Sequence, residues 1–151
     1  MVEAFEQTGG NIVVAMQLPH DQTSRYGILD VAPGSGPLNA VRAMVEKPPA
    51  GTAPSNLAVI GRYILNPNIL RNLSRTRIGT SAEVQLTDAV SDEIAVSDNV
   101  YSCRFSGQRF DYGTKSGFLQ STVAFALARD DLKVDFYSYL QNIITTRTVN
   151  K

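Results

Sequence analysis

The chain has 151 residues, of which 43% are hydrophobic, and its 14 basic and 14 acidic residues give a formal net charge of zero at pH 7. This length and apolar content fit one globular domain with a buried core and exclude a fully disordered chain. The balanced charge provides no overall field that would attract nucleic acid or anionic lipid, so any bound anion must be held by local groups.

The chain has one cysteine, Cys103, and one histidine, His20, and this limits the disulfides and metal sites that it can form. One cysteine permits no intramolecular disulfide, and the two residues together cannot build a structural zinc site. Cys103 lies in an apolar alternation and is predicted to be a packed strand residue. The sequence has no run of about twenty apolar residues and no signal-peptide pattern. We therefore expect a cytoplasmic protein with neither nucleic acid nor membrane among its partners.

The first half of the chain has the pattern of short strands. Residues 1–7 look like the last turns of a helix closed by Gly9 and Gly10, which suggests that the chain was cut from a longer one. A hairpin is expected where the turn residues 33–37 separate two strands. Short apolar runs bounded by glycine, proline or asparagine predict strands over residues 12–18, 26–31, 41–46 and 57–65.

The second half is predicted to be more helical. Thr80 and Glu83 have the spacing of a capping box, and apolar residues then recur every four positions, so a helix is expected over residues 81–96. Residues 100–105 and 109–112 are expected to form another hairpin, and two amphipathic helices end the chain. This order of elements indicates an α/β fold with a mixed sheet.

Two short segments place potential ligand-binding residues in strands. Gly27 enters a strand, where glycine is costly unless the backbone bulges or something approaches it closely. Glu46 and Lys47 precede Pro48, which favours a strand end there. Neighbouring strand side chains point to opposite faces, so both can serve one ligand only if the strand ends or twists at this point. The plainer interpretations are a simple bulge at Gly27 and an exposed ion pair at Glu46 and Lys47.

Two further segments offer oxygen and nitrogen ligands. Asn56 opens an apolar strand that Gly61 interrupts, and its amide suits recognition of sugar hydroxyls. Asp111 ends an expected strand before a glycine turn into a helix, where one carboxylate together with substrate phosphates can hold magnesium. The plainer interpretations are a turn residue at Asn56 and a turn cap at Asp111.

The chain contains five distinctive stretches: 22–28 (QTSRYGI), 45–48 (VEKP), 53–63 (APSNLAVIGRY), 83–89 (EVQLTDA) and 110–113 (FDYG). In this order, they resemble the bacterial UTP:glucose-1-phosphate uridylyltransferases. The resemblance runs from Phe5 to about Leu140. Related sugar nucleotidyltransferases share part of it, but the first and fourth of the stretches that carry it point to the uridylyl branch.

The resemblance implies a partial Rossmann-like nucleotidyltransferase fold with a mixed β-sheet flanked by helices, whose N-terminal half is missing. Residues 1–151 would then be a single C-terminal portion that binds sugar phosphate. The implied reaction converts UTP and glucose-1-phosphate to UDP-glucose and pyrophosphate, with Mg²⁺ shared with the missing half, in a homo-oligomer. The family's triphosphate loop, which ends in Gly-Thr-Arg, does not occur in the sequence. We therefore expect this portion to be inactive alone.

The resemblance also implies roles for individual residues. Gly27 matches the glycine whose backbone meets the sugar, and Glu46 the carboxylate that accepts hydrogen bonds from glucose hydroxyls. Lys47 matches the catalytic lysine that contacts the sugar phosphate, and Asp111 one of two aspartates that hold magnesium. The implied lining of the sugar pocket also includes the main chain of Val59, with Asn56 and Gly61 beside it.

The sequence differs from the family pattern at one segment, and it leaves alternative functions open. Tyr112 and Thr114 differ from the family's usual residues after Asp111. A non-catalytic module for sugar-phosphate binding or oligomerisation, and a different sugar-1-phosphate nucleotidyltransferase, are the alternative functions that the sequence leaves open.

Overall fold

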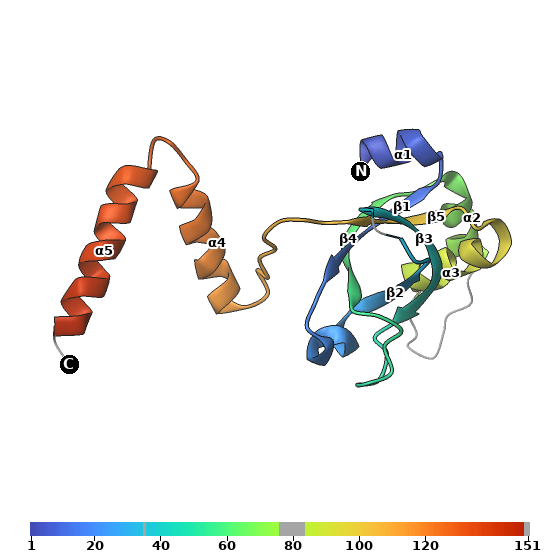
Figure 1. Cartoon of the computed structure of the whole chain (residues 1–151), viewed down its shortest axis with the longest axis horizontal. Coiled ribbons are helices and arrows are strands. Elements are labelled where there is room, and N and C mark those ends of the chain that lie inside the picture. The colour runs from blue at the N-terminus through green and yellow to red at the C-terminus, as the bar shows by residue number, and fades with distance from the viewer. Residues whose placement is uncertain (35, 76–83, 150–151) are drawn as a thin grey trace. The chain divides into compact units, whose positions relative to one another are not determined.

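The structure is a computed structural model that describes residues 1–34, 36–75 and 84–149. The chain divides into two compact units, Met1–Ser106 and Gly107–Lys151. Figure 1 shows the strands gathered in the first unit and two helices in the second. Across the described ranges, no helix is both long and apolar enough to cross a membrane.

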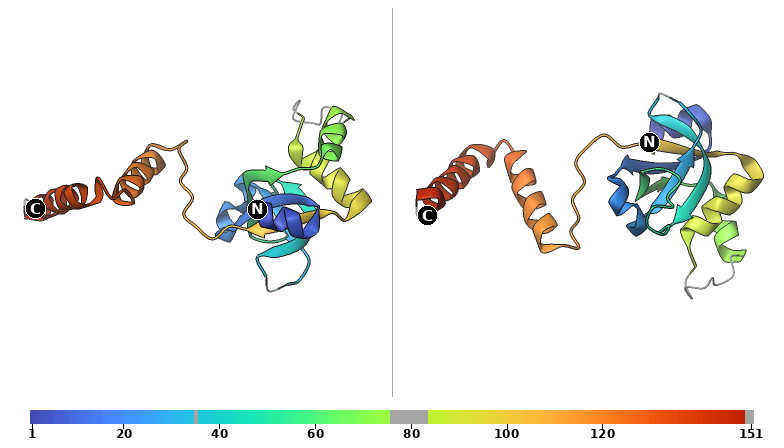
Figure 2. Two further views of the ribbon diagram at one scale, coloured as in Figure 1. Left: turned by 90° about the horizontal axis from the view of Figure 1, so that it is seen from above. Right: turned by 60° about the horizontal axis from the view of Figure 1, so that its bottom comes forward.

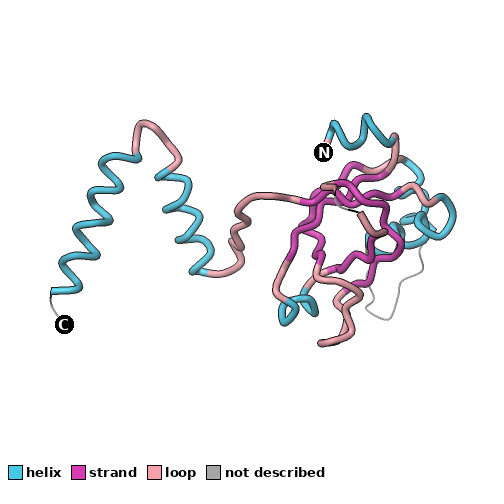
Figure 3. The backbone as a smooth tube through the Cα atoms, viewed as in Figure 1, coloured by secondary structure: helices cyan, strands magenta, loops and turns pink. Residues whose placement is uncertain are grey.

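The first unit is built on a mixed β-sheet that closes into a barrel in the order β1-β4-β2-β3-β5. Closure occurs because β5 pairs antiparallel with β3 and parallel with β1, and Figure 3 shows the strands around a common interior. The α/β class and the mixed sheet are thus confirmed. The strands are β1 (Asn11–Gln17), β2 (Gly27–Val31), β3 (Leu38–Glu46), β4 (Leu57–Ile64) and β5 (Val100–Arg104).

The predicted strands of the first half are confirmed. Three of them match within one residue at each end, and β3 begins three residues earlier than expected. The expected hairpin is formed by β2 and β3, which pair antiparallel. The core extends from the barrel interior, with Val13, Leu29 and Val59, to the helical residues Ile69 and Val90. Five consecutive buried residues in β1 show that this strand is covered on both faces.

Short helices surround the barrel: α1 (Val2–Thr8), η1 (His20–Arg25), α2 (Pro67–Arg75) and α3 (Leu86–Ser97). The end of α1 is as predicted, because Gly9 adopts a left-handed φ of 64° and its amide donates to the Phe5 carbonyl. Neither η1 nor α2 was predicted. The helix expected from residue 81 begins at Leu86, and the capping box of Thr80 and Glu83 lies outside the described residues. α3 contacts both α2 and β3 (Figure 2).

The second unit consists of α4 (Lys115–Leu127) and α5 (Lys133–Val149), which confirms the two final helices. The second predicted hairpin is wrong, because residues 109–112 form no strand. Its first strand exists as β5, but both edges of β5 are already paired, with β1 and with β3. A hairpin partner would need one of these edges to be open.

Candidate functional site

A pocket of about 240 Å³ opens in the first unit where β2, β3, β4 and α3 meet. Four residues proposed from the sequence line it, and they come from three strands that lie far apart along the chain. These are Gly27, Glu46, Val59 and Gly61; the other lining residues are Arg25, Tyr26, Met44, Tyr63 and Thr87.

Gly27 makes room for the carboxylate of Glu46. The two residues face each other in the β2–β3 ladder, and a Cβ at position 27 would lie 3.1 Å from Glu46 Oε2 and 3.3 Å from Met44 Cε. The simple bulge is not the reason for this glycine, because the irregularity in this ladder lies between Asp30 and Val31. The close approach is therefore made by a side chain of the chain itself.

Glu46 and Lys47 point to the same side, as the expected end of the strand requires. β3 ends at Glu46, and Lys47 adopts a left-handed φ of 44°, with its amide donating to the Tyr26 carbonyl at 3.0 Å. Lys47 Nζ then lies 3.6 Å from Glu46 Oε1. Pro48, which follows, is fully buried and fixes the chain beyond this point.

The strain at Lys47 is not offset by the ion pair that it forms. A left-handed conformation costs a non-glycine residue roughly 1–2 kcal/mol, whereas an exposed ion pair contributes at most about 1 kcal/mol. The side chain of Lys47 is 63% exposed and that of Glu46 is 30% exposed. Such backbone strain is concentrated at functional sites, so the arrangement favours a binding role over a stabilising one.

Gly61 lies in a bulge of β4. Along the β1–β4 ladder, Val14 alone faces the three residues between Val59 and Tyr63. Gly61 has a φ of 72°, in the left-handed region that favours glycine. The bulge brings Val59, Gly61 and Tyr63 to the same pocket.

Asn56 lies just before β4 and is not among the residues that line the pocket. Its carbonyl accepts a hydrogen bond from the Leu18 amide at 2.9 Å. The adjacent Ser55 donates from Oγ to the Leu29 carbonyl at 2.5 Å and accepts from the Leu57 amide at 2.9 Å. These bonds fix the start of β4, and the contact of the Asn56 side chain with a sugar stays a prediction.

Thr87 is a site residue that the sequence analysis did not single out. It is buried in the first turn of α3, and its Oγ1 donates to Glu46 Oε2 at 2.8 Å. It belongs to the stretch 83–89 used for the family resemblance, but no residue spacing relates it to Glu46, 41 positions earlier.

Tyr63 also faces this carboxylate. Burial of the ring, and then the negative charge of Glu46, raise the pKa of the Tyr63 phenol above 10.0. The folded state therefore favours the neutral phenol. The stability that results is complete below the unfolded pKa of about 10 and is lost as the pH rises through the higher folded value.

The pKa of Tyr63 gives a first test of this geometry. In an ultraviolet titration, the difference between the wild type and Tyr63→Phe should show one phenol that ionises later than a free tyrosine. The same difference measured in a Glu46→Gln background should move to lower pH, because the repelling charge is gone while the burial remains. An unchanged midpoint would mean that Glu46 does not face the ring.

Asp111 lies in the second unit, in a turn that leads into α4. Its Oδ1 accepts from the Gly113 amide at 2.9 Å, and its carbonyl accepts from the Thr114 amide at 3.3 Å. Thr114 in turn caps α4 by accepting from the Gly117 amide at 3.0 Å. Asp111 therefore caps this turn, its role as a magnesium ligand stays a prediction, and the expectation that it ends a strand is wrong.

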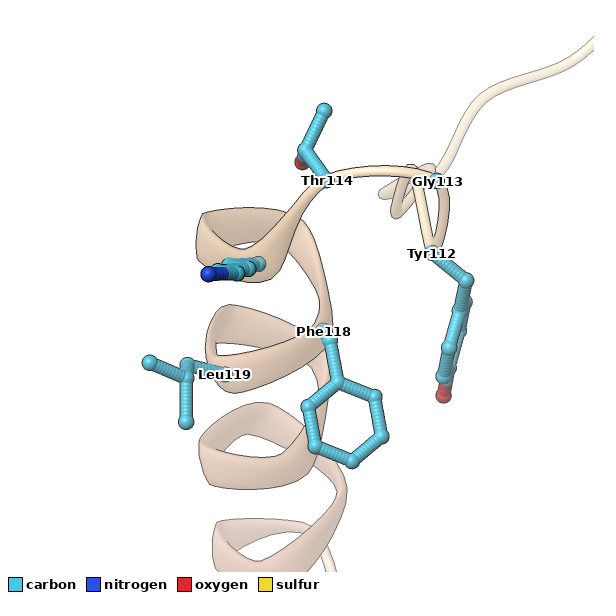
Figure 4. Close-up of a pocket in the computed structure, with 6 residues that line it drawn as sticks. Tyr112, Gly113, Thr114, Phe118 and Leu119 are labelled. Carbon is cyan, nitrogen blue, oxygen red and sulfur yellow. The ribbon is translucent and has the colours of Figure 1, made fainter.

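The turn at Asp111 presents an exposed carboxylate. In the described ranges, no three His, Cys, Asp or Glu side chains are grouped as metal ligands. Figure 4 shows the apolar pocket next to this turn, where Tyr112 and Phe118 meet edge to face, with ring centroids 6.0 Å apart. A carboxylate has more acceptor positions than the bond from Gly113 uses, so Asp111 can still serve as one oxygen ligand.

Comparison with known proteins gives consistent matches. A family model described as nucleotidyl transferase matches residues 1–126. UTP–glucose-1-phosphate uridylyltransferase 1 of Staphylococcus saprophyticus is 41% identical over 143 residues, which are 95% of this chain and 50% of that protein. The structure of UTP-bound UGPase from Acinetobacter baumannii is 33% identical with a TM-score of 0.79, and the match covers 93% of this chain and 48% of the other.

A further solved structure is UDP-glucose pyrophosphorylase complexed with UDP-glucose. It is 33% identical with a TM-score of 0.78, and the match covers 85% of this chain and 49% of the other. The chain thus spans about half the length of the relatives that it matches.

Proposed function

The chain belongs to the nucleotidyl transferase family, among the UTP–glucose-1-phosphate uridylyltransferases, and we propose that it is the sugar-phosphate-binding part of such an enzyme. In the complete enzyme, UTP and glucose-1-phosphate would give UDP-glucose and pyrophosphate. One solved relative is bound to UTP and another is complexed with UDP-glucose, which supports this choice of substrates.

The observation that carries the proposal is the position of Lys47 beside Glu46: Glu46 lines the pocket, and Lys47, which is not itself a lining residue, places its Nζ 3.6 Å from Glu46 Oε1. Glu46 presents a half-buried carboxylate that can accept hydrogen bonds from sugar hydroxyls. Lys47 places its ammonium next to that carboxylate, where it can pair with the phosphate of the same ligand. Gly27, Val59 and Gly61 line the same pocket as Glu46.

The proposed reaction needs no protein nucleophile. A phosphate oxygen of glucose-1-phosphate attacks the α-phosphorus of UTP, a new oxygen–phosphorus bond forms, and the bond to pyrophosphate breaks. Two anions must be held in line for this step, and Lys47 offsets part of their repulsion. Asp111, together with substrate phosphates, would hold Mg²⁺, which supplies further neutralisation of charge when bound.

Membership of this family also suggests which part of the enzyme the chain represents. We propose that residues 1–151 form the C-terminal portion of a Rossmann-like nucleotidyltransferase fold, with the triphosphate loop and the second metal aspartate supplied by the other portion. The half-length coverage of the relatives supports this proposal. Self-association of the chain stays a prediction.

The proposal is tested by binding of glucose-1-phosphate to the 151-residue chain. Calorimetry should show saturable binding by the wild type and at least a tenfold loss of affinity in Lys47→Ala, because a charge-assisted contact is worth roughly 1.5–3 kcal/mol. Glu46→Gln should weaken binding and reduce discrimination among hexose phosphates, since the amide supplies one acceptor oxygen in place of two.

Two variants serve as matched controls. Lys133→Ala removes an exposed lysine that pairs with Asp130 in the second unit, and Asp30→Asn removes an exposed carboxylate that pairs with Arg42. Both should bind glucose-1-phosphate within a factor of two of the wild type. If Lys47→Ala behaved like Lys133→Ala, Lys47 would be an ordinary surface residue and the proposed phosphate contact would be rejected.

A further inference from the structure

The two oxygens of the Glu46 carboxylate have different environments. Oε2 accepts a hydrogen bond from Thr87 Oγ1 at 2.8 Å and lies opposite the open position at Gly27. Oε1 lies 3.6 Å from Nζ of Lys47, whose side chain is 63% exposed. One oxygen is therefore held by the protein, and the other is turned toward the cation that we assign to the sugar phosphate.

Thr87 is itself held in place by the packing of α3. The helix buries Ala89, Val90 and Ile94 in the core. Four residues after Thr87, Ser91 donates from Oγ to the Met44 carbonyl at 3.2 Å. Residues four apart lie on the same face of a helix, so α3 reaches β3 through two hydroxyls: one bonds the main chain of the strand and the other bonds the Glu46 side chain.

A glutamate at the end of a strand has rotamer freedom that it must lose to bind a ligand, and this loss weakens affinity. A donor that is 94% buried and fixed on a packed helix removes that freedom beforehand. The bond to Thr87 is charge-assisted, which makes it stronger than a bond between neutral groups. The space opposite Gly27 is what permits the carboxylate to occupy this position.

We propose that Thr87 is a positioning residue for sugar recognition: it holds Oε2 of Glu46 and leaves Oε1 to accept hydrogen bonds from the sugar hydroxyls. The proposal rests on the proposed function, because it assigns the carboxylate to the sugar. The contribution of α3 to sugar binding is therefore indirect, because Thr87 acts by holding Glu46.

The first experiment needs no ligand. NMR coupling constants should show one dominant side-chain rotamer for Glu46 in the wild-type chain and in Thr87→Ser, which keeps the hydroxyl. Thr87→Val has nearly the same shape but no donor, and there the couplings of Glu46 should average over several rotamers. A single unchanged rotamer in Thr87→Val would overturn the positioning role.

The second experiment measures the affinity for glucose-1-phosphate and for galactose-1-phosphate by calorimetry. Thr87→Val should bind glucose-1-phosphate roughly tenfold more weakly, the effect of one lost charge-assisted bond, and its preference over galactose-1-phosphate should shrink. Thr87→Ser should recover most of both quantities. Thermal unfolding of each variant monitors the fold.

Ser91→Ala is the matched control, because it removes the other hydroxyl with which α3 contacts β3. An equal loss of selectivity in Ser91→Ala would mean that any loosening of α3 has this effect, and would overturn the proposal, as would wild-type affinity and selectivity in Thr87→Val. If the wild-type chain bound no glucose-1-phosphate, the proposed function would fail, and the rotamers of Glu46 would still decide whether Thr87 positions the carboxylate.

Discussion

Gly27→Val should reduce the binding of glucose-1-phosphate by more than tenfold while the barrel stays folded. A Cβ at this position would lie 3.1 Å from Glu46 Oε2 and 3.3 Å from Met44 Cε, and valine adds two further carbons beyond it. Overpacking of this kind costs roughly 1–3 kcal/mol unless a neighbour moves. The nearer neighbour is the Glu46 side chain, and its displacement would break the bond to Thr87.

Calorimetry on Gly27→Val and Gly27→Ala checks this expectation. Gly27 does not have a positive φ, and valine favours strands, so backbone strain does not confuse the result. Alanine requires a shift of only a few tenths of an ångström and should lie between the wild type and valine. Thermal unfolding shows whether the barrel survives. Wild-type affinity in the folded valine variant would mean that the position of Glu46 does not matter for the ligand.

The part of the site that could be predicted from the sequence is the part set by local chemistry. Pro48 identified the end of a strand, and that end explained how Glu46 and Lys47 come to the same side. The left-handed backbone of Lys47 is the means by which this happens, and nothing in the residue type indicates it. Gly27 could be recognised as a close approach, but the identity of the approaching group required the β2–β3 register.

The contacts that were missed join segments far apart in the sequence. Thr87 meets Glu46 only because α3 packs on the barrel and begins at Leu86, five residues later than the periodicity predicted. The closure of the sheet also depends on segments far apart in the sequence, because β5 pairs with both β1 and β3. The false hairpin at residues 109–112 follows from treating β5 as a strand with an open edge.

α2 was missed for a local reason. Pro67 follows the apolar run 57–65 and so predicts the end of a strand, but proline is also favourable at the first position of a helix, where its missing N–H needs no partner. The same residue type therefore marks both the end of β4 and the start of α2. The resemblance to a family could not resolve this, because it assigned roles to site residues and gave no boundaries of elements.

Asp111→Asn should leave the fold of the second unit unchanged and, in the complete enzyme, lower turnover by at least a hundredfold. Asparagine keeps an Oδ1 that can accept from the Gly113 amide, and the cap that Thr114 makes on α4 does not involve this side chain. What the substitution removes is the negative charge, and a metal ligand of this kind supports several kcal/mol of transition-state stabilisation. Circular dichroism of the chain and steady-state kinetics of the enzyme over a range of Mg²⁺ concentrations measure the two effects separately.

The chain alone should show no saturable Mg²⁺ binding below the millimolar range, because a single exposed carboxylate displaces few waters from this ion without a second carboxylate or a ligand phosphate. Asp135→Asn, which removes an exposed carboxylate from α5, is the matched control and should leave turnover unchanged. If Asp111→Asn also turned over like the wild type, the bond to Gly113 would be the whole role of Asp111.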